Sequence, residues 1–129
     1  MRAAEQSLRE SEERFRLAVE GTRDGLWDWN LQTNEAYHSD RFATMLGYET
    51  NELPDTVAAW NELLHPEDKP GALKRVEEYL QGETDFYEST FRMRAKDGSY
   101  RWITGRGKAL FDDAGKPVRF VGFNTDITK

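Results

Sequence analysis

The stretch from residue 86 to residue 127, FYESTFRMRAKDGSYRWITGRGKALFDDAGKPVRFVGFNTDI, decides the fold of this chain. Runs rich in β-branched and aromatic residues predict consecutive strands over Phe86–Ala95, Tyr100–Phe111 and Val118–Ile127. Two short polar segments that contain Asp and Gly, 96–99 and 112–116, separate the runs. Because such segments join neighbouring antiparallel strands, the stretch predicts a three-stranded meander.

The Asp97-Gly98 turn also predicts which strand residues face each other. If these two residues form a type I′ turn, which needs positive φ at both, the register of the hairpin follows by counting. The expected pairs, all on one face of the sheet, are Ala95 with Tyr100, Met93 with Trp102, and Phe91 with Thr104. A strand predicted over Gly25–Leu31 places Trp27 and Trp29 on one of its faces. Together these side chains predict an aromatic concavity.

The residues before this stretch add helices and two further strands. A run free of Gly and Pro predicts a helix over 2–20, which Gly21 would end, and strands are predicted over 25–31 and 36–38. Short helices follow between Asp40 and Leu80. This order predicts an α+β fold in which one five-stranded antiparallel sheet carries short helices on one face. Since the last strand is apolar on both faces, it should lie centrally and be covered on both sides.

Composition excludes several classes of protein. With 129 residues, 37% of them hydrophobic, the chain is long enough for one domain with a real core. Its net charge of −6 argues against nucleic-acid binding, which needs a basic face. The absence of cysteine removes disulfides, thiolate metal sites and cysteine-linked chromophores, and is compatible with a cytoplasmic protein. No apolar run approaches the roughly 20 residues that cross a bilayer, so we expect no membrane contact by this chain.

Six short segments, in this order and spacing, resemble the PAS family, in the subgroup with a Trp-rich first strand. They are 13–15 (ERF), 25–29 (GLWDW), 42–48 (FATMLGY), 64–68 (LHPED), 94–102 (RAKDGSYRW) and 121–128 (VGFNTDIT). The resemblance implies strand order 2-1-5-4-3, a flanking signalling helix over 1–20 and a PAS domain over 21–129. It also implies a sensory or dimerisation role in bacterial signalling proteins, such as histidine kinases and cyclic-di-nucleotide enzymes, with an output domain covalently linked to the sensor.

The aromatic concavity is the candidate binding site. Its expected lining comes from the strands and from the helices that close it: Trp27, Trp29, Phe42, Met45, Trp60, Val76, Phe91, Met93, Trp102 and Thr104. PAS domains hold haem, flavin or metabolites in this position, so the resemblance implies a small-molecule pocket. Such apolar stripes more often form a core that is filled by its own side chains.

No cofactor is predicted. Cysteine-linked chromophores are excluded, and haem is disfavoured because His38, on a short strand, and His65, at a helix start, are poorly placed as axial ligands. A metal at His65, Glu67 and Asp68 is also disfavoured, since the helix dipole alone favours acidic residues in a first turn. The concavity offers only Tyr, Thr and Trp as polar groups, which favours binding over catalysis. We therefore predict that the chain is not an enzyme, whereas its parent protein is of the histidine kinase or diguanylate cyclase/phosphodiesterase kind.

The two ends of the domain carry the expected communication sites. Asp126 and Thr128 resemble the motif that connects the sheet to the output in PAS proteins, and Asp126 is expected to pair with Arg101 or Arg106. The alternative is a merely solvated strand end. At the other end, Leu8 and Phe15 give the helix over 2–20 a thin apolar stripe. This helix either packs on its own domain or pairs with a second subunit, and we predict a homodimer through it.

The predicted function is that of a sensory or dimerisation module that regulates an attached output domain in signal transduction, with room for a small ligand in the concavity. Two alternatives stay open. One is a free-standing small α+β ligand-binding or isomerase-like domain with the same kind of cavity. The other is a pure interaction module without any ligand.

Overall fold

The computed structural model describes residues 2–129, so only Met1 of the predicted flanking segment lies outside it. The elements in chain order are α1 (Arg2–Thr22), β1 (Gly25–Asn30), β2 (Glu35–His38), α2 (Asp40–Thr44), α3 (Val57–Leu63), α4 (Lys69–Leu80), β3 (Tyr87–Arg94), β4 (Tyr100–Phe111) and β5 (Pro117–Asp126). The strands form one five-stranded antiparallel sheet in the order β2-β1-β5-β4-β3. This confirms the predicted fold class, the strand order and the central place of the last strand.

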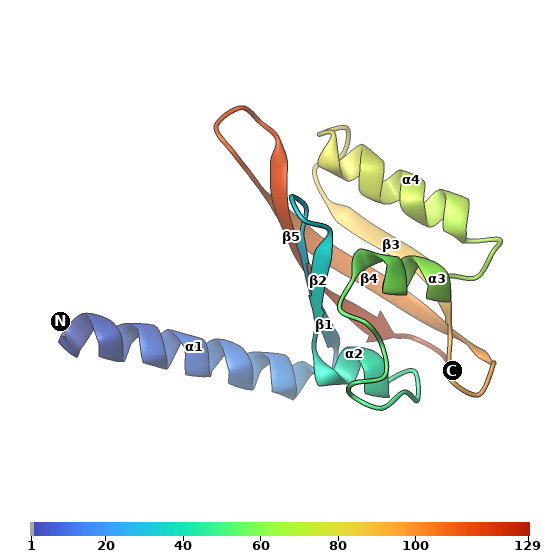
Figure 1. The fold of residues 1–129 in the computed structure, drawn as a ribbon, viewed down its shortest axis with the longest axis horizontal. Coiled ribbons are helices and arrows are strands. Elements are labelled where there is room, and N and C mark those ends of the chain that lie inside the picture. Colours follow the sequence, from blue (N-terminus) through green and yellow to red (C-terminus); the bar gives the residue numbers. More distant parts are fainter. Residues whose placement is uncertain (1) are drawn as a thin grey trace.

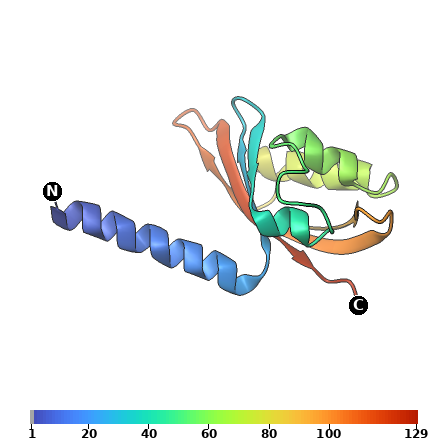
Figure 2. The same cartoon turned by 60° about the horizontal axis from the view of Figure 1, so that its bottom comes forward.

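The sheet has one covered and one open face. Helices α2, α3 and α4 lie on the same side, which we call the inner face, as the ribbon views show (Figure 1, Figure 2). The core between these helices and the sheet is rich in aromatic side chains, and Phe42, Phe91, Phe120 and Ile103 are at most 1% exposed. None of the helices within residues 2–129 covers the opposite side, which we call the outer face (Figure 2).

Two glycines in the sheet make room for the largest core side chain. The ring of Trp27 lies over Gly122 of β5 and Gly107 of β4, where a Cβ atom at either position would collide with it. The ladder between β4 and β5 is regular at these two glycines, and its irregularity falls further along, between Leu110 and Phe111.

The predicted register of the β3–β4 hairpin is wrong by one residue. Met93 faces Arg101 and Phe91 faces Ile103, and the Ala95 N–H donates to the Ser99 carbonyl at 2.7 Å. Of the two turn residues only Gly98 has positive φ, so the loop is a three-residue turn that ends in a left-handed glycine and not a type I′ turn. A shift of one residue moves a side chain to the other face of a sheet.

The segment that carries α3 contacts both edge strands of the sheet. Before α3, Thr56 bridges to Glu35 of β2, and after it Leu64 bridges to Met93 of β3. This segment therefore crosses the inner face from one edge strand to the other, with the Trp60 side chain buried in between. Unpaired strand edges invite association with other chains, so the two bridges protect the sheet at both sides.

Helix α1 projects away from the sheet instead of lying on it (Figure 1, Figure 2). Leu8 is 62% and Phe15 is 53% exposed, so the interpretation that this helix packs on its own domain is wrong. The helix also runs past Gly21 to Thr22, and its end is marked by Arg23 at φ 61°. The expected glycine cap is thus replaced by an arginine in the left-handed region.

Candidate functional site

Most of the predicted cavity-lining residues do meet on the inner face. Seven of them are buried there: Trp27, Trp29, Phe42, Met45, Trp60, Phe91 and Met93. Val76 of α4 packs partly buried at the border of this cluster. The aromatic rings follow one another closely, with centroid distances of 5.2 Å from Trp27 to Trp29 and 5.3 Å from Trp29 to Trp60.

Two predicted lining residues lie on the other side of the sheet because of the register shift. Trp102 faces Arg92 on the outer face and is 44% exposed. Thr104 faces Thr90, and their hydroxyl oxygens are 3.1 Å apart. The prediction that these two residues line the concavity is wrong, and Ile103, which is fully buried, occupies their place on the core face.

The aromatic cluster is close-packed. The space left in it has a volume of about 10 Å³, bounded by Trp27, Trp29, Phe42, Trp60, Tyr87 and Asn124. One water molecule needs about that much room, so the structure has no preformed pocket for a metabolite at this place. Binding of a larger molecule would require the side chains to move apart.

A buried amide, which the sequence interpretation did not single out, holds the centre of the cluster. The indole Nε1–H of Trp27 donates to Asn124 Oδ1 at 2.9 Å, and Asn124 is only 2% exposed. The alternation Phe120, Gly122, Asn124 along β5 places this amide on the core face, a signal that the sequence did contain. Within residues 2–129 the Nε1 of Trp29 is buried without a hydrogen-bond partner.

Neither histidine lies at the small cavity. The side chain of His38 is 4% exposed and stacks on the Phe42 ring at 4.1 Å. Burial lowers the pKa of His38, and the Asp55 carboxylate, 4.0 Å away, opposes this only in part. His65 packs beside the Tyr100 ring at 4.5 Å, and its Nδ1 accepts a hydrogen bond from the Glu67 N–H.

The turn before α4 is held by an ion pair. The Asp68 carboxylate is held by Arg92 in two side-chain hydrogen bonds of 2.9 Å. The described residues 2–129 contain no group of His, Asp or Glu side chains arranged to hold a metal ion.

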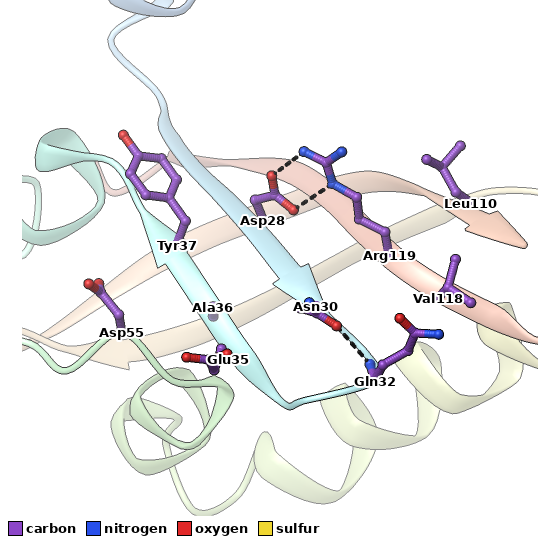
Figure 3. Close-up of a pocket in the computed structure, with 10 residues that line it drawn as sticks. All are labelled: Asp28, Asn30, Gln32, Glu35, Ala36, Tyr37, Asp55, Leu110, Val118 and Arg119. Carbon is purple, nitrogen blue, oxygen red and sulfur yellow. Dashed lines mark hydrogen bonds and ion pairs between the residues drawn. The ribbon is translucent and has the colours of Figure 1, made fainter.

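The outer face carries apolar side chains in the open. Tyr37 and Leu110 are each 56% exposed, and Val121 and Phe123 of the central strand are half-buried. At the end formed by β1, β2 and the β4–β5 hairpin lies a hollow of about 630 Å³ (Figure 3). A bidentate ion pair lies at its base, in which Arg119 donates two hydrogen bonds to the Asp28 carboxylate at 2.6 and 3.0 Å (Figure 3).

A groove lies where α1 meets this face. Its volume is about 860 Å³, and its apolar lining comes from the last turns of α1 and from β1 and β2: Phe15, Val19, Leu26 and Tyr37. Charged side chains of both signs border it, among them Arg16, Glu20 and Arg41. One side of α1 thus forms a wall of this groove, next to the outer face of the sheet.

The C-terminal junction is built partly as predicted. Arg101 lies 3.6 Å from the Asp126 carboxylate, while Arg106 pairs with Glu88 at 3.0 Å, so the expected alternative partner Arg106 is wrong. The Asp126 carboxylate also accepts a hydrogen bond from the Thr128 N–H at 2.8 Å. Since Gly25 pairs with Asn124, the end of α1 and the C-terminal end of β5 lie at the same end of the sheet.

An antiparallel sheet in this order, with short helices on one face and a projecting N-terminal helix, defines the architecture of a class of small α+β domains. Residues 35–124 match the family described as the PAS fold. The chain therefore belongs to the PAS fold family, and as a PAS domain it is a sensory module and not itself a catalytic domain.

Two curated relatives are named as a probable diguanylate cyclase and a sensor protein. The chain is 29% identical over 133 residues to the probable diguanylate cyclase DgcE of Escherichia coli, covering 100% of this chain and 11% of that protein. It is 30% identical over 118 residues to the sensor protein FixL of Bradyrhizobium diazoefficiens, covering 89% of this chain and 22% of that protein. The chain thus spans less than a quarter of either relative.

Solved structures agree with this assignment. A sensory box histidine kinase/response regulator from Burkholderia thailandensis superimposes with a TM-score of 0.78 at 43% identity, over 89% of this chain and 85% of that one. The N-terminal domain of a diguanylate cyclase with PAS/PAC sensor from Marinobacter aquaeolei gives 0.71 at 27% identity, over 81% and 95% of the two chains. In the described part of the chain, no helix has the length and apolar character needed to cross a membrane.

Proposed function

We propose that this PAS domain works as a homodimeric relay, in which α1 pairs with a second copy and the sheet passes the signal to a covalently linked output domain. The observation that carries the proposal is the uncovered apolar outer face beside a projecting α1. A histidine kinase or a cyclic-di-nucleotide enzyme is the proposed output, by analogy with the relatives. A cytoplasmic setting, compatible with the cysteine-free composition, is part of the proposal.

The exposed apolar residues supply the driving force. Leu8 and Phe15 stand seven residues apart on one side of α1 and are more than half exposed. Burying one such side chain against a partner contributes about 2 kcal/mol, and a symmetric dimer does so on both copies. The groove between Phe15, Leu26 and Tyr37 offers the second copy's α1 a place next to the helix it pairs with.

The arrangement of the chain ends supports the relay. Helix α1 leads into Gly25, whose partner in the ladder is Asn124, two residues before Asp126. A movement of α1 in the dimer is therefore applied next to the strand that leads to the output. Nothing larger than a water needs to enter the core for such a relay to work.

A ligand-binding role and the isomerase-like alternative are less well supported. The small cavity has aromatic walls and no carboxylate or histidine. Burial raises the pKa of Tyr87, so its hydroxyl stays protonated and is no base at neutral pH. Native mass spectrometry of protein purified without added ligand tests this part, since a retained small molecule would show that the core opens.

Light scattering on point variants tests the dimer. We expect Phe15→Glu to give a monomer, because a carboxylate would have to be buried between the subunits. Leu17→Glu is the matched control: Leu17 is equally exposed, at 54%, but lies about 200° around the helix from Phe15. Removal of residues 1–14 should also give a monomer. A dimeric mass for both Phe15→Glu and the truncated chain would show that α1 is not the dimer element.

A further inference from the structure

The guanidinium group of Arg92 joins two parts of the domain that are distant in the sequence. On one side the Asp68 carboxylate, at the start of α4, accepts hydrogen bonds from the Arg92 backbone N–H at 2.8 Å and from its Nε and Nη2 at 2.9 Å. Glu67 adds a carboxylate 3.7 Å from Nη2. Charge-assisted, bidentate hydrogen bonds of this kind fix both the position of the guanidinium group and the orientation of its plane.

On its other side Arg92 covers the indole of Trp102. The guanidinium carbon lies 5.0 Å from the centre of that ring, within the range of a cation–π contact. Trp102 is 44% exposed on the outer face, whereas the side chains of Trp27, Trp29 and Trp60 are buried in the core. Arg92 thus holds Trp102, which, unlike the other three tryptophans, is not fixed by packing in the core.

The backbone of Trp102 holds the segment that leaves the sheet. Its N–H donates to the Thr128 hydroxyl at 2.8 Å, and its carbonyl accepts from the Ile127 N–H at 2.9 Å. Regular pairing of β4 with β5 already ends at Asp126. The course of residues 127 and 128 therefore depends on where Trp102 lies.

We propose that Arg92 is a positioning residue that couples the segment between α3 and α4 to the C-terminal exit of the domain through Trp102. The His65 N–H donates to the Arg92 carbonyl at 2.9 Å, so a shift of this segment acts on Arg92 through both its backbone and its side chain. The coupling itself is a property of the single domain; only its meaning as a step toward an output domain rests on the proposed relay function.

Amide hydrogen exchange of the isolated chain, followed by NMR, tests the coupling. In Arg92→Gln we expect the local, urea-independent exchange of the Ile127 amide to accelerate about tenfold, because the charged contacts with Asp68 and Trp102 are lost. Amides of β1 should keep their rates. Arg119→Gln is the matched control. Arg119 also forms a bidentate ion pair, with Asp28, and lies on the same face of the sheet but away from Trp102.

Further variants keep the proposal testable if Arg92→Gln fails to fold. Asp68→Asn weakens the same contact from the other side, and Trp102→Leu removes the ring but keeps the backbone; both should accelerate Ile127 exchange. Unchanged Ile127 exchange in the folded variants would overturn the proposal, as would equal acceleration in Arg119→Gln. Repeating the measurement in the Phe15→Glu background separates this coupling from the dimer, because the effect should persist there whatever the mass of the particle.

Discussion

Replacement of Trp60 by alanine probes whether the core is as closed as the structure shows. Trp60 is 4% exposed and packs against Trp29 at 5.3 Å and edge-on against Phe91 at 5.7 Å. It also sits in the middle of the segment that bridges the two sheet edges. Truncating a tryptophan in such a place costs about 3–5 kcal/mol, from lost burial and from the cavity that remains. Since the whole stability of a domain is about 5–15 kcal/mol, this is roughly a fifth of the total or more.

Urea unfolding followed by circular dichroism measures this cost. With a slope of about 1–3 kcal/mol per M urea, the midpoint should fall by roughly 2 M. Trp102→Ala serves as the control, because the same side chain is removed from an exposed position, and it should cost only about 1 kcal/mol. If Trp60→Ala lowers the free energy of unfolding by less than about 1 kcal/mol, the inference that this indole closes the core is refuted. The aromatic concavity would then again be a candidate ligand site.

Indole extends the same experiment. If the cavity left by Trp60→Ala keeps its shape, added indole should bind there and restore stability, by about 2.7 kcal/mol at a concentration one hundred times its Kd. The unmodified protein should gain nothing, since its residual cavity is only about 10 Å³. Equal stabilisation of both proteins would mean that the ligand enters elsewhere, or that the native core already opens.

Two further predictions concern single residues. Gly122→Ala should destabilise the domain by about 1–3 kcal/mol in urea unfolding, because its Cβ would collide with the Arg106 carbonyl oxygen and with the Trp27 ring. Gly71→Ala, in open space within α4, should be neutral or stabilising. Burial lowers the pKa of His38 from its ordinary value of 6.5. As the pH falls below 6.5, the unfolded chain therefore takes up a proton before the native state does. The free energy of unfolding should decline over this pH range. His38→Gln should lack this part of the decline when unfolding is compared at pH values of about 7.5 and 5.5; identical pH profiles for the two proteins would show that the buried imidazole contributes nothing.

The sequence was sufficient for the strands and most of the core, because the alternation of apolar residues and the turn residues act locally, whereas the strand order was implied by the resemblance to the PAS family. It was insufficient for the β3–β4 register. Asp97-Gly98 fits a two-residue type I′ turn as well as a three-residue turn that ends in glycine, and the choice depends on φ at Asp97, which residue type does not determine. That single step placed Trp102 and Thr104 on the inner face of the sheet, when both lie on the outer face.

The site could be predicted only as a list of side chains. Whether large aromatic residues on one face enclose a pocket or fill it depends on their mutual packing, and a sequence pattern does not contain that information. The glycines under Trp27 illustrate the point. A glycine within a strand often marks a close approach, but the residue type of Gly107 and Gly122 does not tell that an indole occupies the space above them.

In the proposed relay, the position of α1 gives the closed core and the open outer face a common role. Trp27 is two residues from the entry of α1 at Gly25, and its indole is bonded to Asn124, which is two residues from Asp126. A packed core transmits such a displacement because it has little free volume in which to absorb it. An open cavity between β1 and the helices would let Trp27 move without carrying Asn124 along. The filled aromatic cluster is therefore what the proposed relay between the two chain ends requires, and the uncovered outer face is where the proposed second copy would apply the displacement.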